Sequence, residues 1–325
     1  MWYTTCIFRE EKIMVRGKNV KYLLPKDGNL YKANLHCHTT VSDGKFSPEE
    51  IKKIYMEHGY SAVAYTDHQV CRPHTELSDE NFVALTGVEI AFGIKKATSV
   101  HVCGIARDPL TELTIPNDPF DDIEKINAGI ETLRKNGFIT TLNHPRWSGI
   151  SNENLAKVGD VDNIEAVNGY EAIQDGYGDS SAIFESELRR GRRVRPIATD
   201  DSHTIYGERE PGLEYFHGFT VIKAKELSYP ALINAIDDGA FYASTGPTFK
   251  NIWLDGDILH IECSPVCSVY VHGKYYSNRA SVKDKNDTIE CVDINIGEKF
   301  ATSDYLLIQI VERGGGRAFS VPYYL

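Results

Sequence analysis

Residues 31–50 of this chain read YKANLHCHTTVSDGKFSPEE. The segment 31–37 is predicted to be a strand because it carries the apolar and β-forming residues of a half-buried extended run. Ser47 has the properties of a helix N-cap, with Pro48 at the first helical position and Glu50 at the third. A strand that passes through a short polar loop into a helix indicates a β-α-β unit.

The same alternation continues to about residue 245. Further strands are predicted at 61–66, 82–90, 99–106, 138–142, 164–168 and 195–199. Helices are predicted from Ser47 to about His58, from Asp121 or Asp122 to Asn136, at 179–190 and at 226–238. The strands at 82–90 and 99–106 are expected to be adjacent. Strands joined by helical crossovers predict an α/β fold with a parallel sheet or a barrel.

The pattern changes near Gly246-Pro247. From Ile252 onward, short β-forming runs alternate with turns such as Asp255-Gly256-Asp257 and Gly314-Gly315-Gly316. This texture predicts a small antiparallel β-sandwich. We therefore expect an N-terminal extension (1–31), an α/β domain (32–245) and a C-terminal β-domain (246–325).

The charge balance and the cysteines narrow the range of partners and compartments. The 325 residues include 46 acidic and 35 basic side chains, a net charge of −11, which argues against a nucleic-acid polymer as partner. No run approaches the ~20 apolar residues of a membrane span, and the first residues lack the pattern of a signal peptide. Seven cysteines without a Cys-x-x-Cys pair are typical of reduced thiols, so a cytoplasmic location is expected.

Imidazole and carboxylate side chains recur where the predicted strands end. The set is His36, His38, Asp43, His68, Glu89, His101, His144, Asp201 and His203. All except His101 follow or close a strand at its C-terminal end, the edge at which α/β folds build active sites. Burying these groups together without compensation costs several kcal/mol, and divalent cations remove that cost. Mixed imidazole and carboxylate ligands suit zinc, manganese or iron, and the lack of cysteine ligands argues against a structural zinc site.

Each residue alone has a simpler explanation. A single histidine at a strand end is usually a hydrogen-bonded polar residue, and Asp43 has the position of a turn or helix-cap residue. The pair His36-x-His38 by itself fits either interpretation. The metal hypothesis depends on the whole set meeting at one edge.

The order of these motifs resembles the polymerase and histidinol phosphatase (PHP) superfamily. The resemblance covers about residues 32–245 and rests on His36-x-His38 with Ser42-Asp43-Gly44, Thr66-Asp67-His68, Gly87-Val88-Glu89, His101, Asn143-His144-Pro145 and Asp201-x-His203. It implies a distorted (β/α)7 barrel that holds two or three divalent metal ions. Residues 239–247 and the β-rich tail resemble one branch of that superfamily, which includes carbaryl hydrolases and phosphoesterases.

The resemblance also implies how the ligands are shared in a trinuclear centre. One ion would be held by His36, His38, Glu89 and Asp201; a second by Glu89, His101 and His144; and a third by Asp43, His68 and His203. Glu89, Asp201 and His203 are the expected catalytic residues.

The expected activity is that of a metal-dependent phosphoesterase. A metal-bound hydroxide would hydrolyse a phosphomonoester or phosphodiester of a small anionic metabolite or nucleotide. Arg146, two residues after His144, is the candidate substrate-binding residue because a guanidinium grips two phosphate oxygens; a rim salt bridge explains it equally well. Two alternatives stay open: a carbamate, ester or amide hydrolase using the same metals, and a non-catalytic, metal-stabilised binding module.

Overall fold

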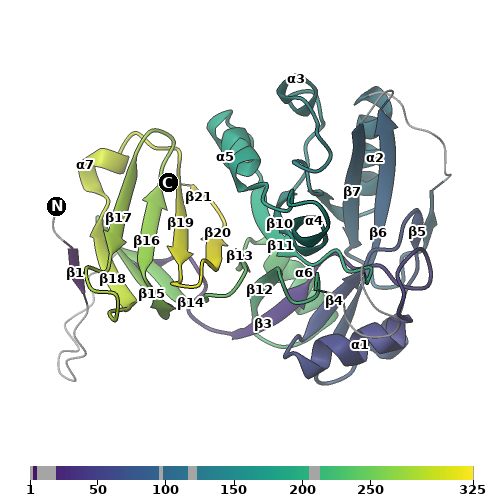
Figure 1. The fold of residues 1–325 in the computed structure, drawn as a ribbon, viewed down its shortest axis with the longest axis horizontal. Helices are drawn as coiled ribbons and strands as arrows, with labels where there is room; N and C mark the ends of the chain where they lie inside the picture. Colours follow the sequence, from purple (N-terminus) through teal and green to yellow (C-terminus); the bar gives the residue numbers. More distant parts are fainter. Residues whose placement is uncertain (1–2, 6–19, 95–97, 116–122, 205–212, 325) are drawn as a thin grey trace.

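The computed structural model describes residues 3–5, 20–94, 98–115, 123–204 and 213–324. Two lobes lie side by side (Figure 1), an α/β lobe that contains the predicted site and a lobe made mainly of C-terminal strands. Their backbones are joined because β13 (Phe241–Ser244) pairs antiparallel with β20 (Arg317–Ser320). Among the described residues, no helix is long and apolar enough to span a bilayer.

The α/β lobe alternates strands and helices much as the sequence predicts. Its remaining strands are β3 (Asn29–Asn34), β4 (Ala62–Tyr65), β5 (Val70–Cys71), β6 (Val83–Ile94), β7 (Thr98–Ala106), β8 (Leu113–Thr114), β9 (Phe138–Leu142), β10 (Asn163–Asn168), β11 (Arg195–Thr199) and β12 (Phe219–Ala224). Its helices are α1 (Pro48–Glu57), α2 (Ile123–Lys135), α3 (Asn152–Leu155), α4 (Gly169–Gln174), α5 (Ser181–Arg189) and α6 (Tyr229–Asp237), with a single 3₁₀ turn at Thr75–Leu77. The residues proposed to cap α2, Asp121 and Asp122, lie outside the described residues.

The strands form an open mixed sheet in the order β11-β10-β9-β7-β6-β4-β3-β12-β13. Parallel pairing links β3, β4 and β6 and links β9, β10 and β11, as expected. The adjacency of β6 and β7 is also as predicted, but these two strands are antiparallel, and β7 and β12 both run against their neighbours. The expected (β/α)7 barrel is therefore not closed by a continuous ladder within the described residues.

Side-chain and isolated backbone contacts span the opening between β11 and β12. The Thr220 hydroxyl accepts from the Ala198 N–H (3.3 Å) and donates to the Ala198 carbonyl (3.0 Å), which takes the place of a ladder. Beyond the end of β3, Cys37 forms an isolated parallel bridge with Ser202. The chain after β11 is thus held against the chain after β3, at the edge where the predicted ligands lie.

The helices cover the sheet with one apolar face each. In α1 that face carries Ile51 and Tyr55, both fully buried, and the predicted capping box is present because Ser47 and Glu50 each accept the other's backbone N–H. Helix α2 buries Ile126, Ile130 and Leu133 in the same way. These contacts bury the apolar faces of both helices against the sheet.

The second lobe consists of two antiparallel sheets, as expected of a small β-sandwich. Its strands are β14 (Phe249–Asp255), β15 (Ile258–Val266), β16 (Ser268–His272), β17 (Ser277–Ser281), β18 (Ile289–Asn295), β19 (Tyr305–Val311) and β21 (Tyr323–Tyr324), with the short helix α7 (Gly297–Phe300). Buried and half-buried residues alternate along β15 and β16. The N-terminal strands β1 (Tyr3–Thr5) and β2 (Val20–Tyr22) pair with β18 and β14.

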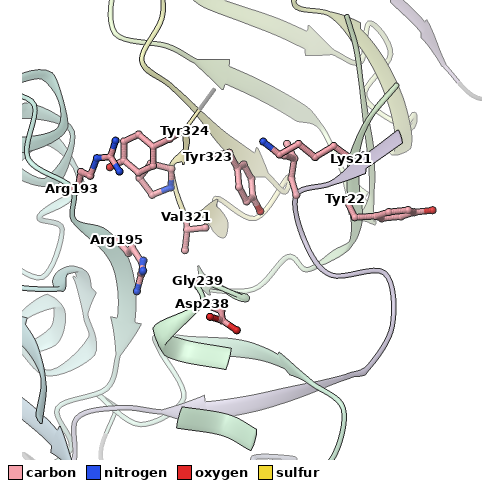
Figure 2. Close-up of a pocket in the computed structure, with 11 residues that line it drawn as sticks. Lys21, Tyr22, Arg193, Arg195, Asp238, Gly239, Val321, Tyr323 and Tyr324 are labelled. Carbon is pink, nitrogen blue, oxygen red and sulfur yellow. The ribbon is translucent and has the colours of Figure 1, made fainter. Parts of the chain in front are cut away.

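A cleft separates the two lobes at the start of β11 (Figure 2). Lys21, Asp238, Val321, Tyr323 and Tyr324 line it together with two arginines, one of which, Arg193, lies over the ring of Tyr324 at 4.5 Å. The other, Arg195, donates to the backbone carbonyls of residues 236 and 237. Since β11 runs from this cleft toward the predicted ligands, the cleft lies at the opposite end of the sheet from them.

Replacing Thr220 with valine tests the side-chain closure between β11 and β12. The substitution keeps the shape and leaves the buried N–H and carbonyl of Ala198 without their partner, so we expect the free energy of unfolding to fall by about 1–3 kcal/mol. Urea denaturation measures the change. The exposed Thr288→Val is the matched control and should change stability little; an unchanged Thr220→Val protein would contradict the closure.

Candidate metal centre

Four predicted ligands form the most buried group of the rim. His36 and His38 follow β3, Glu89 lies within β6, and Asp201 follows β11; each is at most 2% exposed. The two Nε2 atoms lie 3.1 Å apart, and Asp201 Oδ1 lies 3.1 Å from that of His36 and 3.2 Å from that of His38. Glu89 closes the group, with Oε1 3.3 Å from His36 Nε2 and Oε2 3.1 Å from His38 Nε2.

The hydrogen bonds behind this group fix which nitrogen of His36 faces it. His36 Nδ1 lies 2.9 Å from Glu165 Oε1, a fully buried carboxylate that also accepts from the His144 backbone N–H and from Thr199. A carboxylate accepts only, so Nδ1 carries a proton and Nε2 is the nitrogen that faces the group. A carboxylate behind a histidine in this manner is the usual arrangement at metal sites.

The side chains that face the centre are better suited to binding a cation than to hydrogen bonding with one another. Asp201 Oδ1 and His68 Nδ1 are buried, yet neither has a hydrogen-bond partner among the residues that the structure describes. This holds although Asp201 Oδ1 lies beside two imidazole nitrogens and His68 Nδ1 lies 3.2 Å from Glu89 Oε2. Both unpartnered atoms thus lie close to ligand atoms of other predicted residues. The residues present therefore fit divalent metal ions.

A second group of predicted ligands also includes Glu89. It contains His68, after β4, and His101, in β7, whose Nδ1 lies 3.1 Å from Glu89 Oε1. His101 was the one residue that did not fall at a strand's C-terminal end. Because β7 runs antiparallel to β6, its first half lies at the edge where the parallel strands end, and residue 101 pairs with residue 91. The reversed strand explains how this histidine reaches the same rim.

The third group lies nearest to solvent. It contains His38, Asp43, His68 and His203, and Asp43, the most exposed member, has a side chain 54% exposed. His203 Nδ1 donates to the backbone carbonyl of Asp201 (2.8 Å), which leaves Nε2 facing Asp43 Oδ1 at 3.6 Å. The expected third set of Asp43, His68 and His203 therefore lies together, with His38 beside it.

The histidines of the expected second set, His101 and His144, both lie beside Glu89 Oε1, and each also belongs to a further group. His144 Nε2 lies 3.5 Å from Glu89 Oε1, but its compact group within the described residues is formed with Asp201 and Glu171, the latter from α4. His101 instead groups with His68. The nine predicted residues thus share one rim, and Glu89 and Asp201 link the groups.

The backbone at the rim is strained. Among the described residues, His144 (φ 25°) and Asp201 (φ 52°) adopt positive φ although neither is glycine. Gln69 (φ 59°) and Thr204 (φ 74°) do the same next to His68 and His203. Such conformations cost on the order of 1–3 kcal/mol each and are typical of functional sites, where the surroundings must hold the side chain in one direction.

Electrostatics keep the central carboxylates ionised. Burial by itself raises the pKa of Glu89 and of Asp201, but the charges of nearby imidazoles, led by His36, outweigh it and hold both pKa values well below the ordinary range. Burial, reinforced by the charge of Asp201, outweighs the opposing charge of His144 and raises the pKa of Glu171 to about 8. Two carboxylates at the centre therefore stay negative and available to a cation at neutral pH.

Arg146, the candidate substrate-binding residue, lies on the same loop as His144, at the rim of the site. Its guanidinium donates to the backbone carbonyl of Asp179 (3.4 Å) and lies over the ring of Tyr177 at 5.3 Å. It is exposed and makes no ion pair in the described part of the chain. The rim salt bridge considered as its alternative is therefore absent from the described residues, while its role toward a substrate stays a prediction.

Sequence reasoning missed Glu165 and Glu171, together with the amides that orient the central carboxylates. Asn143 Nδ2 donates to Glu89 Oε1 (2.6 Å), and Asn168 Nδ2 donates to Asp201 Oδ2 (3.0 Å) and Glu165 Oε2 (2.8 Å). The signals were present: Glu165 stands inside the otherwise apolar and amide run of β10, and Asn143 and Asn168 close strands at the same edge. A charged residue inside a buried strand needs a partner, which is the clue that points to Glu165.

Comparison with solved structures finds similar arrangements at low identity. The chain is similar to a two-domain protein from Bacteroides vulgatus that contains a predicted PHP-like metal-dependent phosphoesterase (16% identity, TM-score 0.48, 96% of this chain and 100% of that chain). It is also similar to a provisionally described metal-dependent phosphoesterase from Bifidobacterium adolescentis (16%, 0.38, 58% and 92%) and to an amidohydrolase from Chromobacterium violaceum (15%, 0.35, 50% and 84%).

The first of these descriptions names the superfamily that the sequence motifs resemble. No family model and no curated protein matches the chain. The narrower resemblance to the branch with carbaryl hydrolases stays a prediction, and the chemistry of this chain has to be argued from its own residues.

Replacing Glu165 with glutamine tests the support behind His36. The amide removes the charge that fixes the imidazole, so we expect the affinity for Zn²⁺ to fall roughly 10- to 100-fold. Competition with a chromophoric chelator measures it. Glu187→Gln is the matched control, because Glu187 is equally buried but pairs with Arg190 and Arg192; it should lose stability and keep its metal affinity. Equal Zn²⁺ affinity in Glu165→Gln and wild type would show that the support is not needed.

Proposed function

We propose that this protein is a metal-dependent hydrolase that cleaves a phosphate ester of a small anionic molecule. The observation that carries the proposal is the convergence of six histidines and three predicted carboxylates on one rim, where Asp201 Oδ1 and His68 Nδ1 are buried without a hydrogen-bond partner among the described residues. The ions proposed are two or three of zinc, manganese or iron, since these accept mixed imidazole and carboxylate ligands.

The roles of the residues follow from their positions. His36, His38, Glu89 and Asp201 would hold one ion, and the group around Glu89 with His68 and His101 would hold its neighbour. Bound divalent ions would supply water activation at neutral pH and neutralise charge on the phosphoryl oxygens. Glu89, whose two oxygens each contact both groups, would be the carboxylate that the two ions share.

The more exposed group completes the proposed catalytic set. His203 donates its Nδ1 proton to a backbone carbonyl, so its Nε2 would be free to hold a third ion with Asp43 and His68. This group lies nearest to solvent, so the leaving oxygen of a bound substrate would lie close to it. Arg146 would grip the phosphate from the rim as a bidentate donor. Half-buried rings, Trp147 against His101 and His144, and Tyr170 against His203, flank the opening on two sides.

A second candidate keeps the metals and changes the electrophile to a carbamate, ester or amide carbonyl. The scarcity of cationic side chains near the proposed metal ligands favours this second candidate. On the loop that carries His144, Arg146 is the one arginine, and its guanidinium packs over the ring of Tyr177. The net charge of −11 supports neither a nucleic-acid polymer nor an anionic membrane surface as partner, so we propose a small-molecule substrate. The proposed cytoplasmic site of action rests on the cysteine pattern.

A substrate panel separates the two candidates. With Zn²⁺ or Mn²⁺ supplied, we expect turnover of p-nitrophenyl phosphate or bis(p-nitrophenyl) phosphate, and little turnover of aryl esters and carbamates. Asp201→Asn should lose at least about 100-fold in kcat/KM, because the variant loses a charged ligand shared by the groups. Turnover confined to carbonyl substrates would favour the second candidate, and a fully active Asp201→Asn variant would contradict the site.

Replacing Arg146 with alanine tests the phosphate grip. We expect KM for the phosphate substrate to rise about tenfold or more, since a charge-assisted bidentate contact is lost. Steady-state kinetics gives the values. Arg134→Ala is the matched control, because Arg134 is also exposed and also donates to a backbone carbonyl, that of Asp160, but lies on α2. An unchanged KM in Arg146→Ala would leave this arginine a purely structural part of the rim.

A further inference from the structure

The buried acidic side chains of the α/β lobe almost all have donors. Asp67 accepts four hydrogen bonds from Thr39 and Ser42, and Asp200 accepts from Tyr55 and from two backbone N–H groups. Glu187 pairs with two arginines. Each carboxylate thus recovers in the protein the interactions that it loses with water.

Glu171 differs from these residues. It is 3% exposed, its Oε2 is buried without a hydrogen-bond partner, and no donor contacts its carboxylate in the described part of the chain. A buried carboxylate without a donor or a cation costs several kcal/mol. Its position therefore calls for a positive partner that the protein itself does not provide.

The direction in which Glu171 faces identifies that partner. One carboxylate oxygen of Glu171, one oxygen of Asp201 and one ring nitrogen of His144 all lie within 4.8 Å of one another. His144 is 2% exposed, and among the described residues its Nδ1 has no partner either. Two side chains that are more than nine-tenths buried, each with one unpartnered ligand atom, therefore lie together. An oxygen, a nitrogen and a second oxygen at this spacing are a set that a divalent cation can share.

A side-chain cap and a close backbone contact fix the position of helix α4. Asn168 caps the helix by accepting from the Glu171 N–H (2.9 Å) while its amide nitrogen donates to Asp201. At Gly169 a Cβ would lie 2.6 Å from the carbonyl oxygen of Glu214 and 3.0 Å from His217 Cβ, so only glycine permits this close approach. Glu171 is thereby tied to the same amide that orients a predicted ligand.

We propose that Glu171 is a tenth metal ligand, which joins His144 and Asp201. The inference rests on the proposed metal-dependent function and adds a carboxylate to the ligand set implied by the motifs. A further carboxylate favours a harder ion, so Glu171 would strengthen the binding of Mn²⁺ in particular.

The test is a titration of metal-free protein with MnCl₂, followed by the electron paramagnetic resonance signal of free Mn²⁺. Wild type is compared with Glu171→Gln, and with Glu171→Asp as a variant that keeps the charge and shortens the side chain. Asp175→Asn is the matched control, because it removes the same charge at the exposed C-terminal end of the same helix. Thermal unfolding of each protein is recorded with and without Mn²⁺.

We expect Glu171→Gln to bind Mn²⁺ at least about tenfold more weakly at one site, with Glu171→Asp intermediate and Asp175→Asn unchanged. Without metal, Glu171→Gln should be about as stable as wild type, because a neutral amide replaces a carboxyl group that has no donor in the described part of the chain. With Mn²⁺ the variant should gain less stability than wild type. A purely structural role would lower the metal-free stability instead.

The outcomes also separate this inference from the proposed function. If wild type and Glu171→Gln bind Mn²⁺ equally well, or if Glu171→Gln loses stability in the metal-free state, Glu171 is not a ligand and the hydrolase proposal is untouched. If wild type itself binds no divalent metal, both fail together.

Discussion

Buried charge without enough hydrogen-bond donors is the constraint on which the rim of this protein depends. Glu89 and Asp201 are almost fully buried and ionised. Each accepts one side-chain amide N–H, from Asn143 and Asn168 respectively, and the other atoms that face them in the described part of the chain are mainly imidazole nitrogens. Removing such carboxylates from water is unfavourable unless a charge compensates for it. Protonated histidines do so in the metal-free protein, and divalent ions would do so with better geometry.

The fold supplies this convergence by bringing distant segments together at one edge. The chain after β11 lies along the chain after β3, where His38 N–H donates to the Ser202 carbonyl and Asp201 N–H donates to the carbonyl of His36. The reversed direction of β7 brings His101 to the same edge. The positive φ angles at His144 and Asp201 show that the backbone accepts strain there to direct side chains inward.

Much of this arrangement could be predicted from the sequence, because strand ends and helix caps are local signals. The Ser47 capping box, the strands that carry the ligands and the adjacency of β6 and β7 all follow from patterns a few residues long. The direction of β7 could not be predicted, since it depends on pairing across the whole sheet, and neither could the use of Thr220 in place of a ladder. Glu171 was missed because its burial comes from the packing of α4 against the rim, which no local pattern encodes.

Anomalous X-ray diffraction from crystals grown with Zn²⁺ or Mn²⁺ tests the central claim most directly. The account predicts strong peaks at the absorption edge of the added metal, one of them enclosed by His36, His38, Glu89 and Asp201. A well-ordered crystal whose rim side chains adopt the same positions while the anomalous map stays flat there would contradict it, because the unpaired carboxylates would then need another explanation.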